Sequence, residues 1–388
     1  MKIALFGSYG EGNLGDEAIC SAVIADIKNI YPDAEILLFS HDVEDSMRRH
    51  GKNNNLKVRP MIATGFRSLI KQMKSSMFKE SLNELKECNL VIIGGGGLFY
   101  DSEVSVGVNP ILIWLIRVLI FRYLKLKIVL YGLGVGPIKS FISKKLLKIL
   151  GNMVHSITVR DKYSEDILKS CKIYTPIVIS ADPVWGTVWE TRTMQDINKT
   201  PMLKYDAKNK LGIQLRKVKG MKETEFITLM AEFIDIMIDK YLLSVALIPM
   251  SSRDPDDRLL LEKIQVKVRN ENHVEIVDTK KVTDVPNVMQ ECDVLILSRM
   301  HSIIMASNLG IPYIALSYSP KTDDLLYRLE MTECAWPVFD AEATILERLY
   351  LKLMKKKVTI KTHLKNRSND LLECSKSNKE LLLYARES

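Results

Sequence analysis

The sequence lacks the cysteine patterns that bind metals or cross-link small folds. Its 388 residues include six cysteines, and no two of them form a CxxC pair. Their spacings suit neither a zinc site nor a dense disulfide framework. Isolated cysteines inside apolar patterns are typical of buried thiols in a reducing compartment. We therefore expect no metal site and no fold held together by disulfides.

A clean membrane-spanning run is also absent. The stretch 110–131 comes nearest to one, but Arg117, Arg122, Lys125 and Lys127 interrupt it. A spanning helix needs about 20 mostly apolar residues, so none is expected here. We favour a buried helix that runs into a strand. The alternative is a helix at the membrane interface over 110–127, with arginines that reach the lipid headgroups.

Several signatures of other functions are missing. The chain has no GxSxG elbow, and no Walker lysine follows its first glycine-rich turn. It has no arginine-rich tract or nucleic-acid-binding signature, so we expect no nucleic-acid partner. The net charge of +8 is modest for this length. It favours anionic partners without choosing among them.

The chain opens as a strand. MKIALFGSYG is too short for a signal peptide and runs directly into a glycine turn. We therefore expect a cytoplasmic protein. Peripheral attachment at the inner face of a membrane stays open, through residues 110–127 or through the basic C-terminal tail.

Short apolar runs, small-residue turns and helical patterns alternate along the chain. This alternation predicts α/β architecture with parallel, doubly wound sheets. The pattern weakens over 186–208, which we interpret as a linker, and then restarts. We predict two Rossmann-like domains facing a central cleft, at 1–190 and 205–340. Residues 341–388 form a basic helical extension that caps the second domain or crosses back onto the first.

Glycine-rich segments follow several predicted strands of the first half. In the first of them, GSYGEGNLGD, Asn13 and Asp16 are candidate helix caps, and Asp16 is equally a candidate to face a ligand. After the predicted buried strand Asn89–Ile93 come four glycines, including Gly95 and Gly96. Such a run costs folding entropy, which favours a loop that admits a ligand. A third segment, GLGVGP, repeats the pattern.

Cationic residues follow other predicted strands. Arg160 comes after one in the first half, and its planar fork suits a carboxylate or phosphate. The densest cluster is Arg299, His301 and Ser302 within SRMHS, where a strand ends and a helix begins. Lys321 follows the next strand. Because both loops lie at the carboxyl ends of parallel strands, we expect these residues to gather at one edge.

Taken together, these segments resemble the polysaccharide pyruvyl transferases. The resemblance rests on GNLGDEA, VIIGGGGLF, YGLGVGPI, VRDKYS, ADPVW and SRMHSIIMASNLGIPYIALSY, in that order over about residues 1–335. It implies a GT-B-like fold. It also implies transfer of the enolpyruvyl-derived unit of phosphoenolpyruvate to a sugar, with a pyruvate ketal as product and phosphate released. The acceptor is a cell-surface glycan or its lipid-linked precursor.

The resemblance also implies roles for individual residues. Arg160, Arg299 and Lys321 match basic positions that hold the anionic donor, with Asn13, Gly95, Gly96 and Ser302 as further substrate-binding candidates. His301 matches the general acid, a role that suits an imidazole because its pKa lies near neutrality. Asp16 is the candidate that orients or deprotonates an acceptor hydroxyl. No metal or organic cofactor is required.

Two alternatives remain open at this point. A GT-B glycosyltransferase would use a nucleotide-sugar donor, with Glu330 or Glu333 gripping the ribose. A carbohydrate-binding protein with a decayed site would need no catalysis, but the intact Arg160, Arg299, His301 and Lys321 argue against it. Neither the acceptor sugar nor the oligomeric state follows from the sequence.

Overall fold

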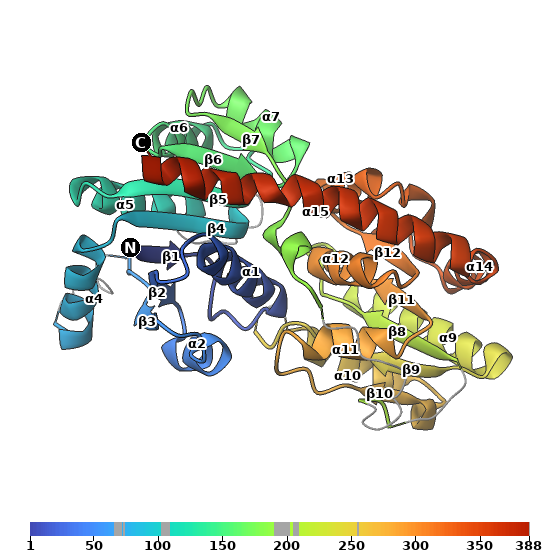
Figure 1. Cartoon of the computed structure of the whole chain (residues 1–388). Coiled ribbons are helices and arrows are strands. Elements are labelled where there is room, and N and C mark those ends of the chain that lie inside the picture. The colour runs from blue at the N-terminus through green and yellow to red at the C-terminus, as the bar shows by residue number, and fades with distance from the viewer. Residues whose placement is uncertain are drawn as a thin grey trace. The chain divides into compact units, whose positions relative to one another are not determined.

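The computed structural model describes residues 1–65, 72, 74–101, 109–189, 202–204, 209–253 and 256–387 (Figure 1). The chain forms two compact units. The first unit comprises residues 1–11, 16–186 and 371–388, and the second comprises residues 12–15 and 187–370. The predicted linker at 186–208 lies largely outside the described residues.

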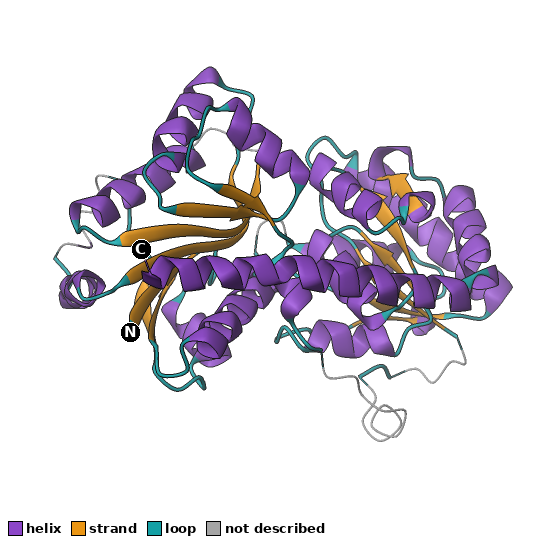
Figure 2. Ribbon diagram, turned by 45° about the horizontal axis from the view of Figure 1, so that its top comes forward, coloured by secondary structure: helices purple, strands orange, loops and turns teal. Residues whose placement is uncertain are grey.

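In the first unit, the described residues form a parallel sheet of seven strands in the order β3-β2-β1-β4-β5-β6-β7. The strands are β1 (Lys2–Phe6), β2 (Glu35–Ser40), β3 (Leu56–Pro60), β4 (Leu90–Phe99), β5 (Lys127–Val135), β6 (Ser156–Val159) and β7 (Ile177–Ile179). The helices are α1 (Leu14–Ile30), α2 (Val43–His50), α4 (Ser76–Lys86), α5 (Pro110–Tyr123), α6 (Phe141–Gly151), α7 (Lys162–Ser170) and the 3-10 turn η1 (Pro183–Gly186). Helices cover both faces of the sheet (Figure 2), which is why its central strands are almost wholly apolar.

Two of the three glycine-rich segments predicted as loops lie inside strands instead, whereas the first, between β1 and α1, is a loop as predicted. β4 includes Gly94–Gly97, and β5 includes the GLGV of the third glycine segment. The two strands pair through this region, with Gly96 opposite Leu133 and Gly97 opposite Gly134, and the register shifts beyond Gly97. The prediction of loops here is wrong. Each strand satisfies the other's backbone, a relation that neither segment reveals by itself.

Residues 110–131 form a buried helix followed by a strand, which confirms the favoured interpretation. Arg117 lies inside α5 and is only 5% exposed. Its guanidinium donates to the Ile62 carbonyl at 3.2 and 3.1 Å and lies 4.6 Å from the centre of the Trp114 ring. Burial lowers the pKa of Arg117 to about 10. Among the described residues, none of the helices combines the length and apolarity needed to cross a membrane.

The cysteines are buried as predicted, with one exception. Five of them lie in the interior, and Cys374 is exposed. Burial raises the pKa of the Cys88 thiol to about 12. This environment keeps such a thiol protonated and inert.

In the second unit, the described residues form a parallel sheet of six strands in the order β10-β9-β8-β11-β12-β13. The strands are β8 (Lys210–Gln214), β9 (Ser244–Leu247), β10 (Val274–Ile276), β11 (Val294–Leu297), β12 (Tyr313–Ser317) and β13 (Ala335–Pro337). The helices are α9 (Glu223–Tyr241), α10 (Asp257–Lys267), α11 (Asp284–Gln290), α12 (Met300–Leu309), α13 (Pro320–Arg328), α14 (Ala343–Lys355) and the 3-10 turns η2 (Glu271–His273), η3 (Thr332–Cys334) and η4 (Val338–Asp340). β13 was not predicted from the sequence, and neither was β3 of the first unit.

The C-terminal residues form α14 and the long helix α15 (Lys357–Glu387). The end of α15 belongs to the first unit. There, Tyr31 donates to the carbonyl of Leu382 at 2.6 Å, and Lys379 pairs with Asp26 at 3.0 Å. Ion pairs within the chain are also formed by Lys357, Arg367 and Lys376 of this helix.

Candidate active site

The strand order locates the switch point of each sheet. In a doubly wound sheet, ligands bind beyond the carboxyl ends of the strands where the order reverses. The reversal lies between β1 and β4 in the first unit and between β8 and β11 in the second. SRMHS follows β11, and Lys321 follows β12 in the first turn of α13. The predicted cationic residues of the second half thus lie at neighbouring strand ends.

Arg299 begins α12 and is held in a buried ion pair. Its Nε and Nη2 atoms lie 2.7 and 2.6 Å from the two carboxylate oxygens of Asp257, the first residue of α10. Asp257 is fully buried, and Arg299 is 7% exposed. The charge of Arg299 is therefore largely balanced inside the protein. Sequence reasoning missed Asp257, which stands 42 residues away and in no motif.

Gln214 and Ser302 form hydrogen bonds with the backbone at the start of α12. The Oε1 atom of Gln214 accepts from the backbone N–H of Arg299 at 2.9 Å and lies 3.1 Å from the Ser302 hydroxyl. That hydroxyl also lies 2.6 Å from the carbonyl oxygen of Arg299. Both side chains are completely buried. The structure thus buries Ser302 in the first turn of α12, where its hydroxyl stabilises the backbone of that turn.

His301 is half-buried and lies against Gly15. A Cβ atom at Gly15 would overlap the Nδ1 atom of His301, so glycine is needed for the imidazole to occupy this position. Gly15 belongs to the segment 12–15, which is part of the second unit. Backbone hydrogen bonds fix this segment, from Leu14 to Met250 at 2.9 Å and from Ser252 to Gly12 at 3.1 Å.

Asn13 and Asp16 have different roles at the start of α1. Asn13 is the cap, because its Oδ1 atom accepts from the backbone N–H of Gly15 at 3.0 Å. Asp16 lies within the first turn and is half-buried. A Cβ atom at Gly96 would lie 3.2 Å from its Oδ1 atom, so the carboxylate is directed at β4. Asp16 follows directly after Gly15, the residue that His301 contacts.

Gly95 allows α1 to pack closely against β4. Its φ of +68° is rare for other residues, and a Cβ atom there would overlap the side chain of Ile19 in α1. The close approach that the glycine run permits is made, at this residue, by α1. Gly96, with a φ of +77°, leaves room for the Asp16 carboxylate.

Arg160 lies at the end of β6 in a second buried ion pair. Its Nη1 atom is 2.9 Å from Asp182, and its Nε atom is 3.5 Å from Asp161. A Cβ atom at Gly134 would lie 2.6 Å from the guanidinium, so this glycine of β5 makes room for it. The side chain is 7% exposed. Asp182 belongs to the ADPVW segment, so the pair joins two motifs of the first unit.

Sequence reasoning missed Arg216, which follows β8 at the switch point of the second unit. It is half-buried, and its Nη1 atom donates to the Tyr318 hydroxyl at 2.8 Å. The cation also lies 5.0 Å from the centre of the Tyr318 ring. Tyr318 follows β12, next to the loop of Lys321. The available signal was weak, since Arg216 is one basic residue in the basic run RKVK.

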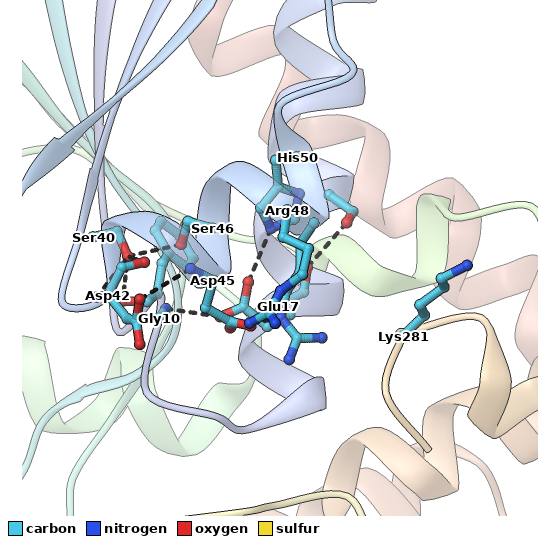
Figure 3. Close-up of polar contacts among 12 residues, drawn as sticks. Gly10, Glu17, Ser40, Asp42, Asp45, Ser46, Arg48, His50 and Lys281 are labelled. Atoms are coloured by element: carbon cyan, nitrogen blue, oxygen red, sulfur yellow. Dashed lines mark hydrogen bonds and ion pairs between the residues drawn. The ribbon is translucent and has the colours of Figure 1, made fainter. Parts of the chain in front are cut away.

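A second overlooked group anchors the loop after β1. Glu17 is fully buried, and its two oxygens contact the backbone N–H of Gly10 at 2.8 Å and the Nε2 atom of His50 at 2.9 Å (Figure 3). Gly10 has a φ of +77°. Glu17 therefore holds the glycine turn from inside, with His50 of α2 as its partner. The GNLGDEA segment includes this glutamate, but its pattern does not reveal the distant histidine.

Comparison with known proteins assigns the family. Residues 13–320 match the family model described as polysaccharide pyruvyl transferase. The chain belongs to this family. It is 22% identical over 373 residues to the amylovoran biosynthesis protein AmsJ of Erwinia amylovora, covering 86% of this chain and 88% of that protein. The resemblance seen in the sequence is thereby confirmed, and the protein is an enzyme of polysaccharide synthesis.

Solved structures confirm the GT-B-like fold. Anabaena Alr3699/HepE in complex with UDP-glucose aligns with a TM-score of 0.65 at 13% identity, over 99% of this chain and 100% of that one. A putative UDP-N-acetylglucosamine 2-epimerase from Listeria monocytogenes aligns with a TM-score of 0.62 at 13% identity, over 98% and 97%. A glycosyltransferase from Rickettsia africae gives a TM-score of 0.61 at 12% identity, over 100% and 97%. At such identities the likeness concerns the fold alone.

Proposed function

We propose that this enzyme transfers the enolpyruvyl-derived group of phosphoenolpyruvate to a sugar of a cell-surface polysaccharide or of its lipid-linked precursor. The product is a pyruvate ketal that bridges two hydroxyls, and phosphate is released. The proposal assigns no step to a metal or an organic cofactor. A cytoplasmic location is part of the proposal, because isolated buried thiols favour a reducing compartment.

The observation that carries the proposal is the set of groups at the switch point of the second unit. Arg216, His301 and Lys321 follow β8, β11 and β12, three adjacent strands of one sheet. Nearby, α12 begins without a side-chain cap from Arg299, and a helix N-terminus favours an anion. A donor with a carboxylate and a phosphate suits such a place.

The proposed first step is a proton transfer. His301 donates its proton to C3 of phosphoenolpyruvate, the C2–C3 double bond is lost, and positive charge develops at C2. The first sugar hydroxyl adds to C2 and its proton returns to the imidazole. Phosphate then leaves C2, the second hydroxyl adds, and the last proton leaves with phosphate. One positioned proton donor contributes about 10²- to 10⁴-fold, and the surrounding cations stabilise the departing charge.

Asp16 is proposed to orient an acceptor hydroxyl or to accept its proton. Three features support this role: its place in the first turn of α1, its partial exposure and its position next to Gly15 in the sequence. Asn13 caps the helix, so the Asp16 carboxylate is not needed for that purpose. Asp16→Asn should therefore impair transfer more than donor binding.

The test is phosphate release from phosphoenolpyruvate with a panel of lipid-linked and nitrophenyl glycosides. His301→Gln should abolish release while donor binding stays within about tenfold, because mainly a transition-state contact is lost. His273→Gln is the matched control, since this histidine of the same unit is exposed in η2. In deuterium oxide, the pyruvyl methyl group should gain one deuterium. Unchanged turnover in His301→Gln would remove the histidine from the mechanism.

The competing function is glycosyl transfer from a nucleotide-sugar donor. It is considered because HepE, a protein of similar fold, binds UDP-glucose. Glu330 pairs with Arg367 at 2.9 Å and Glu333 with Lys352 at 2.8 Å. Glu330, Glu333 and Lys352 line a cavity of about 400 Å³ near η3 and α14. Thermal shifts discriminate between the two donors. Stabilisation by UDP and not by phosphoenolpyruvate would favour glycosyl transfer.

A further inference from the structure

α6 exposes large apolar side chains on its outward face. Phe141, Ile142 and Ile149 are 70%, 66% and 50% exposed. The opposite face of α6 is anchored in the core through Leu147 and Leu150, which are fully buried. The helix is therefore formed and fixed to the first unit, and its exposed apolar side chains are held in place on it. Figure 1 shows the position of α6 in that unit.

Lysines surround these apolar side chains. Lys144, Lys145 and Lys148 are all exposed on the same helix, and Lys139 is exposed just before it. The Nζ atom of Lys145 lies 4.5 Å from the centre of the Phe141 ring. In the part of the chain that the structure describes, none of the four forms an ion pair. The sequence 138–152 contains no acidic residue. This face thus combines unbalanced positive charge with apolar side chains.

A neighbouring turn extends the same surface. Tyr174 is 79% exposed, and its backbone N–H donates to the Asn152 side chain at the end of α6 at 2.8 Å. The Asn152 amide in turn donates to the carbonyl of Lys172 at 3.3 Å. Lys172 is also exposed. The turn adds one aromatic ring and one more cation beside α6.

We propose that α6 and the turn at 172–174 form a docking surface for an anionic lipid bilayer. Lysines attract the negative membrane surface, and apolar side chains beside them enter the boundary between headgroups and acyl chains. Every cation of the surface is a lysine, a residue depleted from the cores of protein interfaces, whereas arginine is enriched there. Charge and residue type therefore favour a lipid surface over a protein partner.

This location differs from both segments considered from the sequence. Most apolar side chains of α5 are in the core and Arg117 is buried, although Leu119 and Tyr123 are exposed. Many cations of α15 are paired, including Arg367 with Glu330 and Lys379 with Asp26. α6 instead presents lysines and apolar groups together.

The experiment is co-sedimentation of the full chain with vesicles of phosphatidylcholine, with and without 30 mol% phosphatidylglycerol. The protein should bind the anionic vesicles and dissociate as salt rises. Replacing Lys144, Lys145 and Lys148 by glutamine should weaken binding about 10- to 100-fold. Replacing Phe141, Ile142 and Ile149 by glutamine should weaken it at any salt concentration. Binding needs neither donor nor acceptor, so this result is independent of the proposed reaction.

The matched control removes the same charge elsewhere. Lys74, Lys79 and Lys86 are exposed in and before α4, so their replacement by glutamine should leave vesicle binding within about twofold. Equal weakening by both lysine triples would mean attraction by net charge alone and would overturn the assignment to α6. Absence of vesicle binding, with a dimer that the apolar triple variant dissociates, would assign the face to a second copy of the chain instead.

Discussion

Arg299 and Asp257 form a bidentate ion pair in the interior of the second unit, with N–O distances of 2.7 and 2.6 Å. The pair joins the start of α12 to the start of α10. Arg299 directly precedes the segment that presents His301. The ion pair therefore fixes the position of the first turn of α12, which carries His301, the proposed proton donor. Arg299 thus acts on the site at least in part by positioning this backbone.

Asp257→Asn should destabilise the protein by about 3–5 kcal/mol, because it leaves the Arg299 guanidinium buried without its counter-charge. Urea denaturation measures the effect through the transition midpoint. Asp239→Asn is the control, since it breaks an exposed pair with Arg269 and should change the midpoint little. Similar shifts in both variants would show that burial does not determine the strength of the Asp257 pair.

Gly15→Ala should lower the rate of phosphate release by about 10²-fold or more, because the new methyl group must displace the His301 imidazole. Donor affinity, measured by titration, should change much less. Gly186→Ala is the matched control, since the nearest atom to its Cβ, the Ser375 hydroxyl oxygen, would be 3.8 Å away. Full activity in a folded Gly15→Ala variant would contradict the proposed role of His301.

Arg216→Met should weaken donor binding about tenfold or more, since it removes a half-buried cation at the switch point while keeping an apolar stem. The KM for phosphoenolpyruvate should rise. Tyr318→Phe, which removes only the hydroxyl that Arg216 contacts, should have a smaller effect in the same direction. Lys217→Met, at an exposed neighbouring position, serves as the control. An unchanged KM in Arg216→Met would exclude Arg216 from the donor site.

Gly95→Ala should cost roughly 2–4 kcal/mol, because it combines a left-handed φ with an overlap against Ile19. Gly94→Ala should be milder, since its nearest neighbour would be 3.4 Å away. A double-mutant cycle with Ile19→Ala separates the two causes. The cycle should show a favourable coupling from removal of the overlap, while the cost of the φ angle stays. Zero coupling would contradict the contact between α1 and β4.

The order of elements was predictable because each one is encoded locally. Apolar runs ending in small residues mark buried parallel strands, and helical periodicity marks the connections between them. The same logic placed SRMHS and Lys321 at strand ends. It failed at Gly94–Gly97, where composition indicated a loop. Pairing with the equally glycine-rich β5 makes this segment a strand, and such pairing depends on two segments more than 30 residues apart.

The sequence by itself determined the family, the two doubly wound sheets and the strand ends at which the candidate residues lie. Tertiary structure decided what those residues contact. Asp257 balances Arg299, Asp182 balances Arg160, and Gly15 makes room for His301. The physical reason is the difference in sequence separation between local patterns and tertiary contacts. Periodicity and turn chemistry act within a few residues, whereas these two ion pairs and this close contact join residues 22 to 286 positions apart.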